Sequence, residues 1–379
     1  MNELVILILM LAGLSLVSGY IFHRTRRIIP YIHSEAKVRA WKANLIPDPR
    51  LYEFAESAKT ERILTALEDT GYQTYLTGIS MENGIELEEV EDSFNLFLND
   101  RYSDILEIVP EEREGMIERI VGIVNVHNLK GIVIGIERGL SEEKMRRYLV
   151  PSPTFSEERL EMLTSAETMD GLLEYLEGFE YSESLSEALE KKYEEEGISS
   201  LLRALDKAYY QTLWEEVRSK EAQRSVLETI IGTKLDMENI KMIMRMKKDD
   251  VTPARIDEFL IPTYHLSDEQ IRSMTSAEDI DAAGEVVRDT TYGPAVREGL
   301  NRFKETGSLS DLEKVLDEQF LRGCRRVSRT QPFSLASLLE YIYSVRTEVK
   351  NLRIIIGLKE AGVEPERIRK KLIVGREIE

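Results

Sequence analysis

From Arg27 to the C-terminus, apolar residues recur at spacings of three and four positions, which is the pattern of helices that bury one face. The segments TERILTALEDTGYQTYL (60–76) and SLLRALDKAYYQTLWEEV (200–217) are typical of this pattern. Alternating apolar and polar positions, which would indicate strands, are scarce. The sequence therefore predicts an all-α fold class.

The first residues of the chain follow a different pattern. Leu4–Phe22 carries no charge, and its 19 residues would form a helix of roughly 28 Å, close to the hydrocarbon thickness of a bilayer. The basic residues Arg24, Arg26 and Arg27 follow it, and the positive-inside rule keeps such a flank in the cytoplasm. We interpret residues 1–27 as a membrane helix and its flank; a cleaved signal peptide and a buried or partner-packed helix are the alternatives.

The helical part of the chain repeats itself. Asn128, Asn239 and Asn351 recur at a nearly constant interval, and the segments that begin at them align without gaps. These segments read NLKGIVIGIERGLSEEKMRRYLVP, NIKMIMRMKKDDVTPARIDEFLIP and NLRIIIGLKEAGVEPERIRKKLIV. Such self-similarity at a fixed period indicates internal triplication.

Each of the three segments encodes a helix, a tight turn and a second helix. Gly139 and Gly362 stand where the first helix ends, because glycine suits the left-handed position just past a helix C-terminus. Asp250 occupies the same place in the middle segment, at some conformational cost. Pro253 and Pro365 fall at the first position of the second helix, where the missing N–H of proline costs nothing.

A second motif repeats with the asparagines, beginning with Ser-Ala and ending at Tyr72, Tyr181 and Tyr292. The period of about 111 residues is too long for a solenoid repeat, and each copy is long enough to hold a small helical core. We therefore predict three pseudo-symmetric helical domains in a ring-like or funnel-like body. The predicted domains cover residues 28–150, 151–262 and 263–379.

The charge and the polar residues give no sign of chemistry. A net charge of −19 argues against a nucleic-acid partner, and the single Cys324 excludes an intrachain disulfide. The four histidines lack metal-ligand spacing, and the chain has no glycine-rich phosphate loop after a strand. We predict no catalytic residue, cofactor, metal or small-molecule substrate, and we interpret the repeated asparagines as structural.

The repeated pattern N-[LI]-[KR]-x-I, followed by the helical hairpin and combined with the Ser-Ala…Tyr motif, resembles the C subunit of archaeal A-type ATP synthases. That family is similar to the d subunit of vacuolar-type ATPases. The segment SEAKVRAWKANLI (Ser34–Ile46) also resembles the first helix of the family. The resemblance covers about residues 30–379, nearly the whole chain.

The resemblance implies a noncatalytic central-stalk protein on the cytoplasmic face of the membrane. Such a protein sits on the proteolipid rotor ring, receives the foot of the central shaft and transmits torque for ATP synthesis coupled to proton or sodium transport. The family often has an arginine six residues after the asparagine; Arg245 matches and is a candidate partner contact, whereas Ile134 and Gly357 depart from the pattern.

The apolar segment 4–22 also departs from the family, and we expect it to enter the lumen of the ring. The alternative function is a membrane-tethered helical adaptor unrelated to ATP synthesis.

Overall fold

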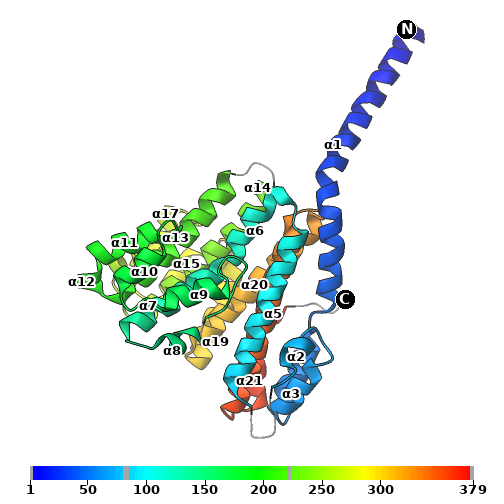
Figure 1. Cartoon of the computed structure of the whole chain (residues 1–379). Coiled ribbons are helices and arrows are strands. Elements are labelled where there is room, and N and C mark those ends of the chain that lie inside the picture. Colours follow the sequence, from blue (N-terminus) through cyan, green and yellow to red (C-terminus); the bar gives the residue numbers. More distant parts are fainter. Residues whose placement is uncertain (1–2, 80–84, 148, 220–222, 376–379) are drawn as a thin grey trace.

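A computed structural model describes residues 3–79, 85–147, 149–219 and 223–375 of the protein. Helix is the regular secondary structure throughout these ranges, and no strand occurs in them. The predicted all-α fold class is therefore confirmed for this part of the chain. Three groups of helices make up the body (Figure 1), and the long helix α21, which belongs to the first group, also contacts the other two.

The first group combines both ends of the chain. The helix α21 packs against α1, α2, α3 and α5, and α22 packs against α2. The N-terminal helices therefore complete their core with the last helices of the chain, which are distant in the sequence. The bounds are α1 (Glu3–Ala43), α2 (Asp48–Glu56), α3 (Thr60–Leu67), α4 (Gln73–Leu76), α5 (Leu87–Ile108), α21 (Leu335–Glu360) and α22 (Pro365–Lys371).

The second group is continuous in sequence and centres on α13, against which α7 and α11 pack. Apolar side chains of α13, such as Leu201, Leu205 and Val217, are fully buried. The bounds are η1 (Glu111–Arg113), α6 (Glu114–Val121), α7 (Ile123–Glu137), α8 (Glu142–Arg146), α9 (Glu157–Thr164), α10 (Met169–Tyr175), α11 (Ser182–Lys191), α12 (Tyr193–Glu196) and α13 (Ile198–Ser219).

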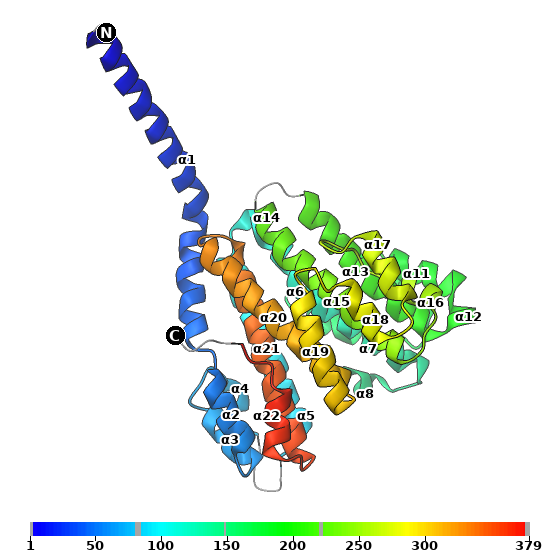
Figure 2. The same cartoon turned by 180° about the vertical axis from the view of Figure 1, so that it is seen from behind.

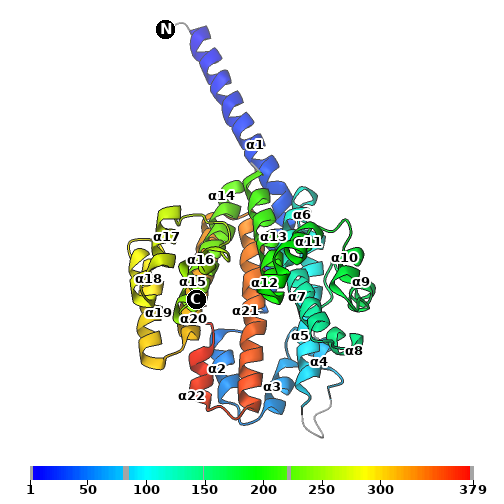
Figure 3. The ribbon, with the colours of Figure 1, turned by 90° about the vertical axis from the view of Figure 1, so that its left-hand side faces the viewer.

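The third group centres on α20, which packs against α15 and α19 and also against α21. Figure 3 shows helices of the second and third groups on either side of α21, with α2, α3 and α22 at the end away from α1. The bounds are α14 (Arg224–Leu227), η2 (Glu228–Gly232), α15 (Thr233–Lys248), α16 (Pro253–Asp257), α17 (Asp268–Ser276), α18 (Ile280–Val286), α19 (Gly293–Thr306) and α20 (Leu309–Thr330).

The same turn ends α7, α15 and α21. The φ angles of Gly139, Asp250 and Gly362 are +62°, +54° and +70°, all in the left-handed region. In each turn the next residue donates its N–H to the carbonyl five positions earlier, as in the bond from Leu140 to Gly135 of 2.9 Å. This is the Schellman arrangement, which satisfies carbonyls left open at a helix C-terminus.

The middle turn carries a strain that the other two avoid, because Asp250 has a Cβ atom in the left-handed conformation. Replacing Asp250 with glycine should therefore stabilise the protein by about 0.5–1 kcal/mol. Chemical denaturation of the two proteins measures this difference. The opposite kind of change in the last turn, Gly362→Ala, should destabilise the protein by a similar amount. If Asp250→Gly destabilised the protein, the assignment of strain to the middle turn would be contradicted.

Helix α1 projects far beyond the body (Figures 1 and 2). Its C-terminal part packs on α21, where Lys42 Nζ lies 2.5 Å from a carboxylate oxygen of Glu340 and the rings of Trp41 and Tyr341 lie 5.4 Å apart. Its projecting part exposes apolar side chains to solvent. The most exposed of these are Leu14 (69%), Leu16 (75%) and Phe22 (69%).

By length and composition, the stretch Glu111–Glu137 is apolar enough to cross a membrane, but 56% of its apolar window is buried inside the body. It contains α6 and α7, whose apolar side chains form the core. Met10–Phe22 is a shorter apolar helix. The membrane span predicted over residues 4–22 stays a prediction, and its side chains before Met10 lie outside the described part of the chain.

Candidate interaction site

The three repeated asparagines make the same pair of hydrogen bonds. Each side chain lies on the first helix of a hairpin, and its Nδ2 donates to the carbonyl of the residue 22 positions later, while its Oδ1 accepts from that residue's N–H. The Nδ2···O and N···Oδ1 distances are 2.7 and 2.9 Å for Asn128 with Val150, 2.9 and 3.0 Å for Asn239 with Ile261, and 2.7 and 2.8 Å for Asn351 with Ile373. We call these three pairs the asparagine clamps.

The asparagine clamps hold the chain that leaves each hairpin against the hairpin's first helix. Asn128, Asn239 and Asn351 are only 2%, 1% and 1% exposed. A buried backbone N–H or C=O needs a hydrogen-bond partner, and one amide side chain supplies both a donor and an acceptor. The repeated asparagines therefore lock the exit of three hairpins.

Three residues before each asparagine stands a second buried polar side chain, which the repeated sequence pattern does not reveal. Asp236 accepts hydrogen bonds from the backbone N–H groups of Tyr264 (2.8 Å), His265 (2.7 Å) and Leu266 (3.2 Å). The phenol of Tyr292 donates a fourth bond of 2.7 Å to the same carboxylate. This one side chain therefore fixes the loop after α16 to α15.

The other two hairpins carry Glu348 and Asn125 at the matching position. Glu348 accepts from the N–H of Ile46 and, at 3.0 Å, from the phenol of Tyr72. Asn125 accepts from the hydroxyl of Ser152 at 2.6 Å. All three positions thus anchor a distant loop, although the residue type differs.

The repeated tyrosines each precede a helix: Tyr72 before α4, Tyr181 before α11 and Tyr292 before α19. All three rings are buried, at 1%, 5% and 1% exposure. Burial raises the pKa of Tyr181 and, together with the charge of Asp236, that of Tyr292. Tyr181 and Tyr292 therefore remain neutral at physiological pH. All three tyrosines act as packing residues, and two of them donate a hydrogen bond to an anchoring carboxylate, Tyr72 to Glu348 and Tyr292 to Asp236.

Two residues after each asparagine, a cation joins the hairpin to a long helix. Lys130 Nζ lies 2.5 Å from Asp206 on α13, and Lys241 pairs with Asp317 on α20. Arg353 Nε lies 2.6 Å from Glu91 on α5. The partners in each lysine pair are 76 positions apart in the sequence, whereas the arginine of the last hairpin reaches back to the N-terminal part of the chain.

Arg245, the candidate partner contact, lies on the exposed side of α15. Its side chain is 60% exposed and pairs with Glu313 on α20.

The glycines and prolines of the hairpins have structural roles. Gly131 and Gly135 give α7 a smooth face, because a Cβ atom added at Gly135 would clash with the side chain of Met145. Pro253 and Pro365 occupy the first positions of α16 and α22.

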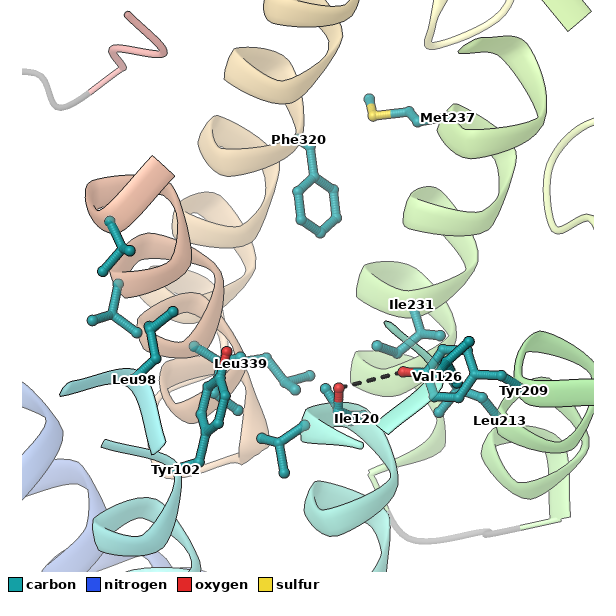
Figure 4. Packing of buried hydrophobic residues seen from close by; sticks show 14 of the residues in the cluster. Leu98, Tyr102, Ile120, Val126, Tyr209, Leu213, Ile231, Met237, Phe320 and Leu339 are labelled. Carbon is teal, nitrogen blue, oxygen red and sulfur yellow. Dashed lines mark hydrogen bonds between the residues drawn. The ribbon is translucent and has the colours of Figure 1, made fainter. Parts of the chain in front are cut away.

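The three groups of helices converge on a cavity of about 410 Å³, which we call the central cavity. Figure 4 shows the packing beside it, where the phenol of Tyr209 donates to the carbonyl of Ile120 at 3.3 Å. Its lining comes from α5, α7, α13, α15, α20 and α21 and includes no catalytic arrangement among the described residues. The polar lining residues are Asn95, Tyr102, His127, Tyr210, Lys234, Glu238, Asp317, Tyr343, Arg346, Thr347, Lys350 and Arg353.

Lysines fix the ionisation of the two carboxylates in this lining. Burial favours the neutral form of Glu238, but Lys234 at 2.7 Å and Lys241 at 3.2 Å outweigh it and lower its pKa to about 2. Burial is likewise outweighed at Asp317, where Lys241 and Lys350 hold the pKa below its usual range. Both carboxylates are therefore ionised at neutral pH.

These lowered pKa values predict a dependence of stability on acid. In the unfolded chain Glu238 titrates near its ordinary pKa of 4.5, and in the folded protein near 2. The unfolded state therefore binds more protons between these values, and stability that is fully present above about pH 4.5 should fall by a few kcal/mol towards pH 2. Urea unfolding at several pH values measures this loss, and Glu238→Gln should reduce it; an unchanged pH dependence in that variant would contradict the assignment.

The remaining reactive groups form no site. Among the residues that the structure describes, no three His, Cys, Asp or Glu side chains lie together as metal ligands. Cys324 is buried, and burial raises the pKa of its thiol, which disfavours a nucleophilic role. The fold and the asparagine clamps thus define an all-helical class of protein, whose repeated polar side chains hold its loops and hairpins in place.

Comparison with known proteins agrees with this class. A model of the ATP synthase C/AC39 subunit family matches residues 34–371. The chain is 28% identical over 347 residues to the C subunit of the A-type ATP synthase of Methanocaldococcus jannaschii, covering 91% of this chain and 87% of that one. It is 30% identical over 354 residues to that of Thermococcus gammatolerans (93% and 92% covered) and 28% identical over 362 residues to that of Pyrococcus abyssi (94% and 95% covered).

The chain belongs to the C/AC39 subunit family of ATP synthases. The predicted resemblance to the archaeal A-type C subunit is confirmed by these relatives. The chain is accordingly a noncatalytic member of a membrane-associated ATP synthase complex, and its partners lie within that complex.

Proposed function

We propose that the chain is the central-stalk protein that links the rotor shaft to the membrane proteolipid ring. In this role it transmits torque for ATP synthesis coupled to proton or sodium transport. The observation that carries the proposal is the position of α21, which packs against α1, α5, α14 and α20. Helix α21 also contacts the second group of helices, because Arg346 Nη2 donates to the carbonyl of Ile120 on α6 at 3.2 Å.

Torque transmission requires a body that resists twisting between its two ends. Helix α21 is buried along most of its 26 residues, and closely packed interiors transmit strain because they are hardly compressible. The asparagine clamps and the ion pairs of Lys130, Lys241 and Arg353 cross-link the hairpins to their long helices. These features favour a rigid coupling over a flexible adaptor.

We further propose that the body contains three copies of one unit arranged as a funnel around the central cavity. Three asparagine clamps, three Schellman turns and three cations at matching positions support this interpretation. The predicted boundaries follow the sequence period, but helix packing favours another grouping: 31–108 with 335–375, then 114–219, then 224–330. The last hairpin then belongs with α5, to which Arg353 is tied.

We propose that residues 4–22 insert into the membrane from the cytoplasmic face. The described apolar side chains from Met10 to Phe22 are exposed on all sides of α1, and a helix that is apolar all round needs apolar surroundings on every side. A protein that turns with the rotor cannot be tethered outside the ring, so the segment would enter the ring lumen. A cross-linker at Ala12 should then label the inner ring helices; labelling of outer-ring lipid or stator proteins alone would contradict this placement.

The end of the body that carries α1 would then face the ring, and the opposite end would face the shaft. Arg245 is a candidate partner contact, because its side chain is 60% exposed and makes its ion pair on the surface. Surface pairs of this kind contribute little to stability. An effect of Arg245→Ala on assembly would therefore report a lost partner contact and not an unfolded protein.

Native purification tests the proposed function. The tagged full-length chain should be isolated from membranes in mild detergent, and the co-purifying proteins identified by mass spectrometry. The proposal predicts that proteolipid and shaft proteins co-purify in constant ratio to the chain. Absence of proteolipid and shaft proteins from the purified material would contradict it.

A further inference from the structure

The central cavity has a charge opposite to that of the protein as a whole. The chain carries a net charge of −19, yet four cationic side chains line the central cavity against two carboxylates. The cations are Lys234, Arg346, Lys350 and Arg353, and the carboxylates are Glu238 and Asp317. Arg353 is already paired with Glu91 on α5, so the excess charge rests on the other three cations. Cavities lined by one sign of charge concentrate ligands of the other sign.

The lysines and carboxylates of the central cavity do not balance. Glu238 pairs with Lys234 and Lys241, and Asp317 pairs with Lys241 and Lys350. Three lysines therefore share two carboxylates, which leaves one positive charge in excess among side chains that are 26% (Lys234), 7% (Lys241) and 56% (Lys350) exposed. Buried or half-buried charges are costly without a counterion, so an anion in the cavity would lower the free energy of this network.

Arg346 supplies a second uncompensated charge. Its Nε donates to the phenol oxygen of Tyr102 at 2.7 Å and its Nη2 donates to the carbonyl of Ile120 at 3.2 Å. The guanidinium also lies over the rings of Tyr102 and Tyr343, 5.1 and 5.8 Å from their centres. No carboxylate of the described residues pairs with it, and a guanidinium has five N–H donors, so donors remain for a ligand in the cavity.

We propose that the central cavity is a binding site for a small multivalent oxyanion of the phosphate or pyrophosphate class. Arg346 and Lys350, four residues apart on α21, would hold the anion from one side and Lys234 on α15 from the other. Charge-assisted bonds from guanidinium and ammonium groups are the usual means of binding such oxygens, and tyrosine hydroxyls at the cavity wall can donate further bonds. The volume of about 410 Å³ lies in the range of small-molecule sites.

The inference does not rest on the proposed function, because it concerns the isolated chain. An anion bound where the three helix groups meet would join α15, α20 and α21 through one shared ligand. It would therefore stiffen the body at the point where its parts converge, whatever the chain is attached to.

Calorimetric titration of the purified full-length chain with sodium pyrophosphate tests the proposal, with sodium chloride at equal ionic strength as the reference. Saturable binding is expected, with an accompanying rise in Tm. Lys350→Met and Arg346→Met should each weaken binding about tenfold, since each removes a charge-assisted bond. Glu238→Gln should tighten binding, because it removes a negative charge from the lining.

Lys370→Met is the matched control, because Lys370 lies on α22 with a 71% exposed side chain. It should bind pyrophosphate as the natural chain does. The side chain of Lys350 is 56% exposed, so the Lys350→Met variant should fold. It therefore tests the proposal even if the Arg346→Met variant does not fold. Absence of saturable binding to the natural chain, or equal weakening in Lys350→Met and Lys370→Met, would overturn the proposal.

Discussion

Replacing Asp236 with alanine is expected to lower the free energy of unfolding by about 3–5 kcal/mol, which is at the upper end for a single substitution. Asp236 is completely buried. The change would leave three backbone N–H groups and the phenol of Tyr292 without their acceptor. The buried donors must then remain unpaired or admit water.

Equilibrium unfolding in guanidinium chloride measures this loss. Two companion variants separate its causes: Tyr292→Phe removes only one of the four bonds and should cost about 1 kcal/mol, and Asp257→Ala, an exposed aspartate on the next helix, should stay within about 0.5 kcal/mol of the natural chain. A cost for Asp236→Ala close to that of Asp257→Ala would show that this carboxylate does not anchor the loop.

Alanine substitution of each asparagine in the clamps is the second large prediction. Asn128→Ala, Asn239→Ala and Asn351→Ala should each lower the free energy of unfolding by about 2–4 kcal/mol, because each leaves a buried N–H and a buried carbonyl unpaired. The three costs should be similar, since the three pairs have matching distances and burial.

The same unfolding experiment compares the three variants, with Asn301→Ala as the control because Asn301 is an exposed residue on α19. Hydrogen exchange adds a local test: the amide of Ile373 should lose protection in Asn351→Ala but keep it in Asn128→Ala. A negligible cost at one asparagine and a large cost at the other two would mean that the clamps are not equivalent.

Local sequence signals were sufficient for the three hairpins. Glycine past a helix end and proline at a helix start act through their own backbone geometry, so Gly139, Gly362, Pro253 and Pro365 could be assigned without knowledge of the fold. The recurrence of asparagine could also be read directly. The hydrogen-bond partner of each asparagine could also have been predicted, because Val150, Ile261 and Ile373 each follow their asparagine by the same 22 positions.

The anchoring residues could not be found in the same way. Asn125, Asp236 and Glu348 differ in type, and a single acidic residue on an amphipathic helix is usually on the solvated face. Only the loop that packs over it makes Asp236 a buried acceptor. The sequence did contain a signal for the two lysine ion pairs: the separation between Lys130 and Asp206 is the same as that between Lys241 and Asp317.

The central cavity and the pairing of the chain ends depend on contacts that no local pattern encodes. Lys234 on α15 is far in the sequence from Asp317 and Arg346, which lie on the consecutive helices α20 and α21, and an apolar helix face does not specify which other face covers it. The sequence therefore predicted the helices and the hairpins but not that α21 completes a core with α5.

The central claim, that this chain mechanically links the shaft to the ring, is tested most directly by ion pumping in reconstituted vesicles. ATP synthase would be assembled with and without the chain, and ATP hydrolysis and ATP-driven ion transport measured on the same samples. We predict that without the chain hydrolysis continues while ion transport is lost, and that added chain restores transport. Ion transport at the full rate in vesicles that lack the chain would contradict the claim.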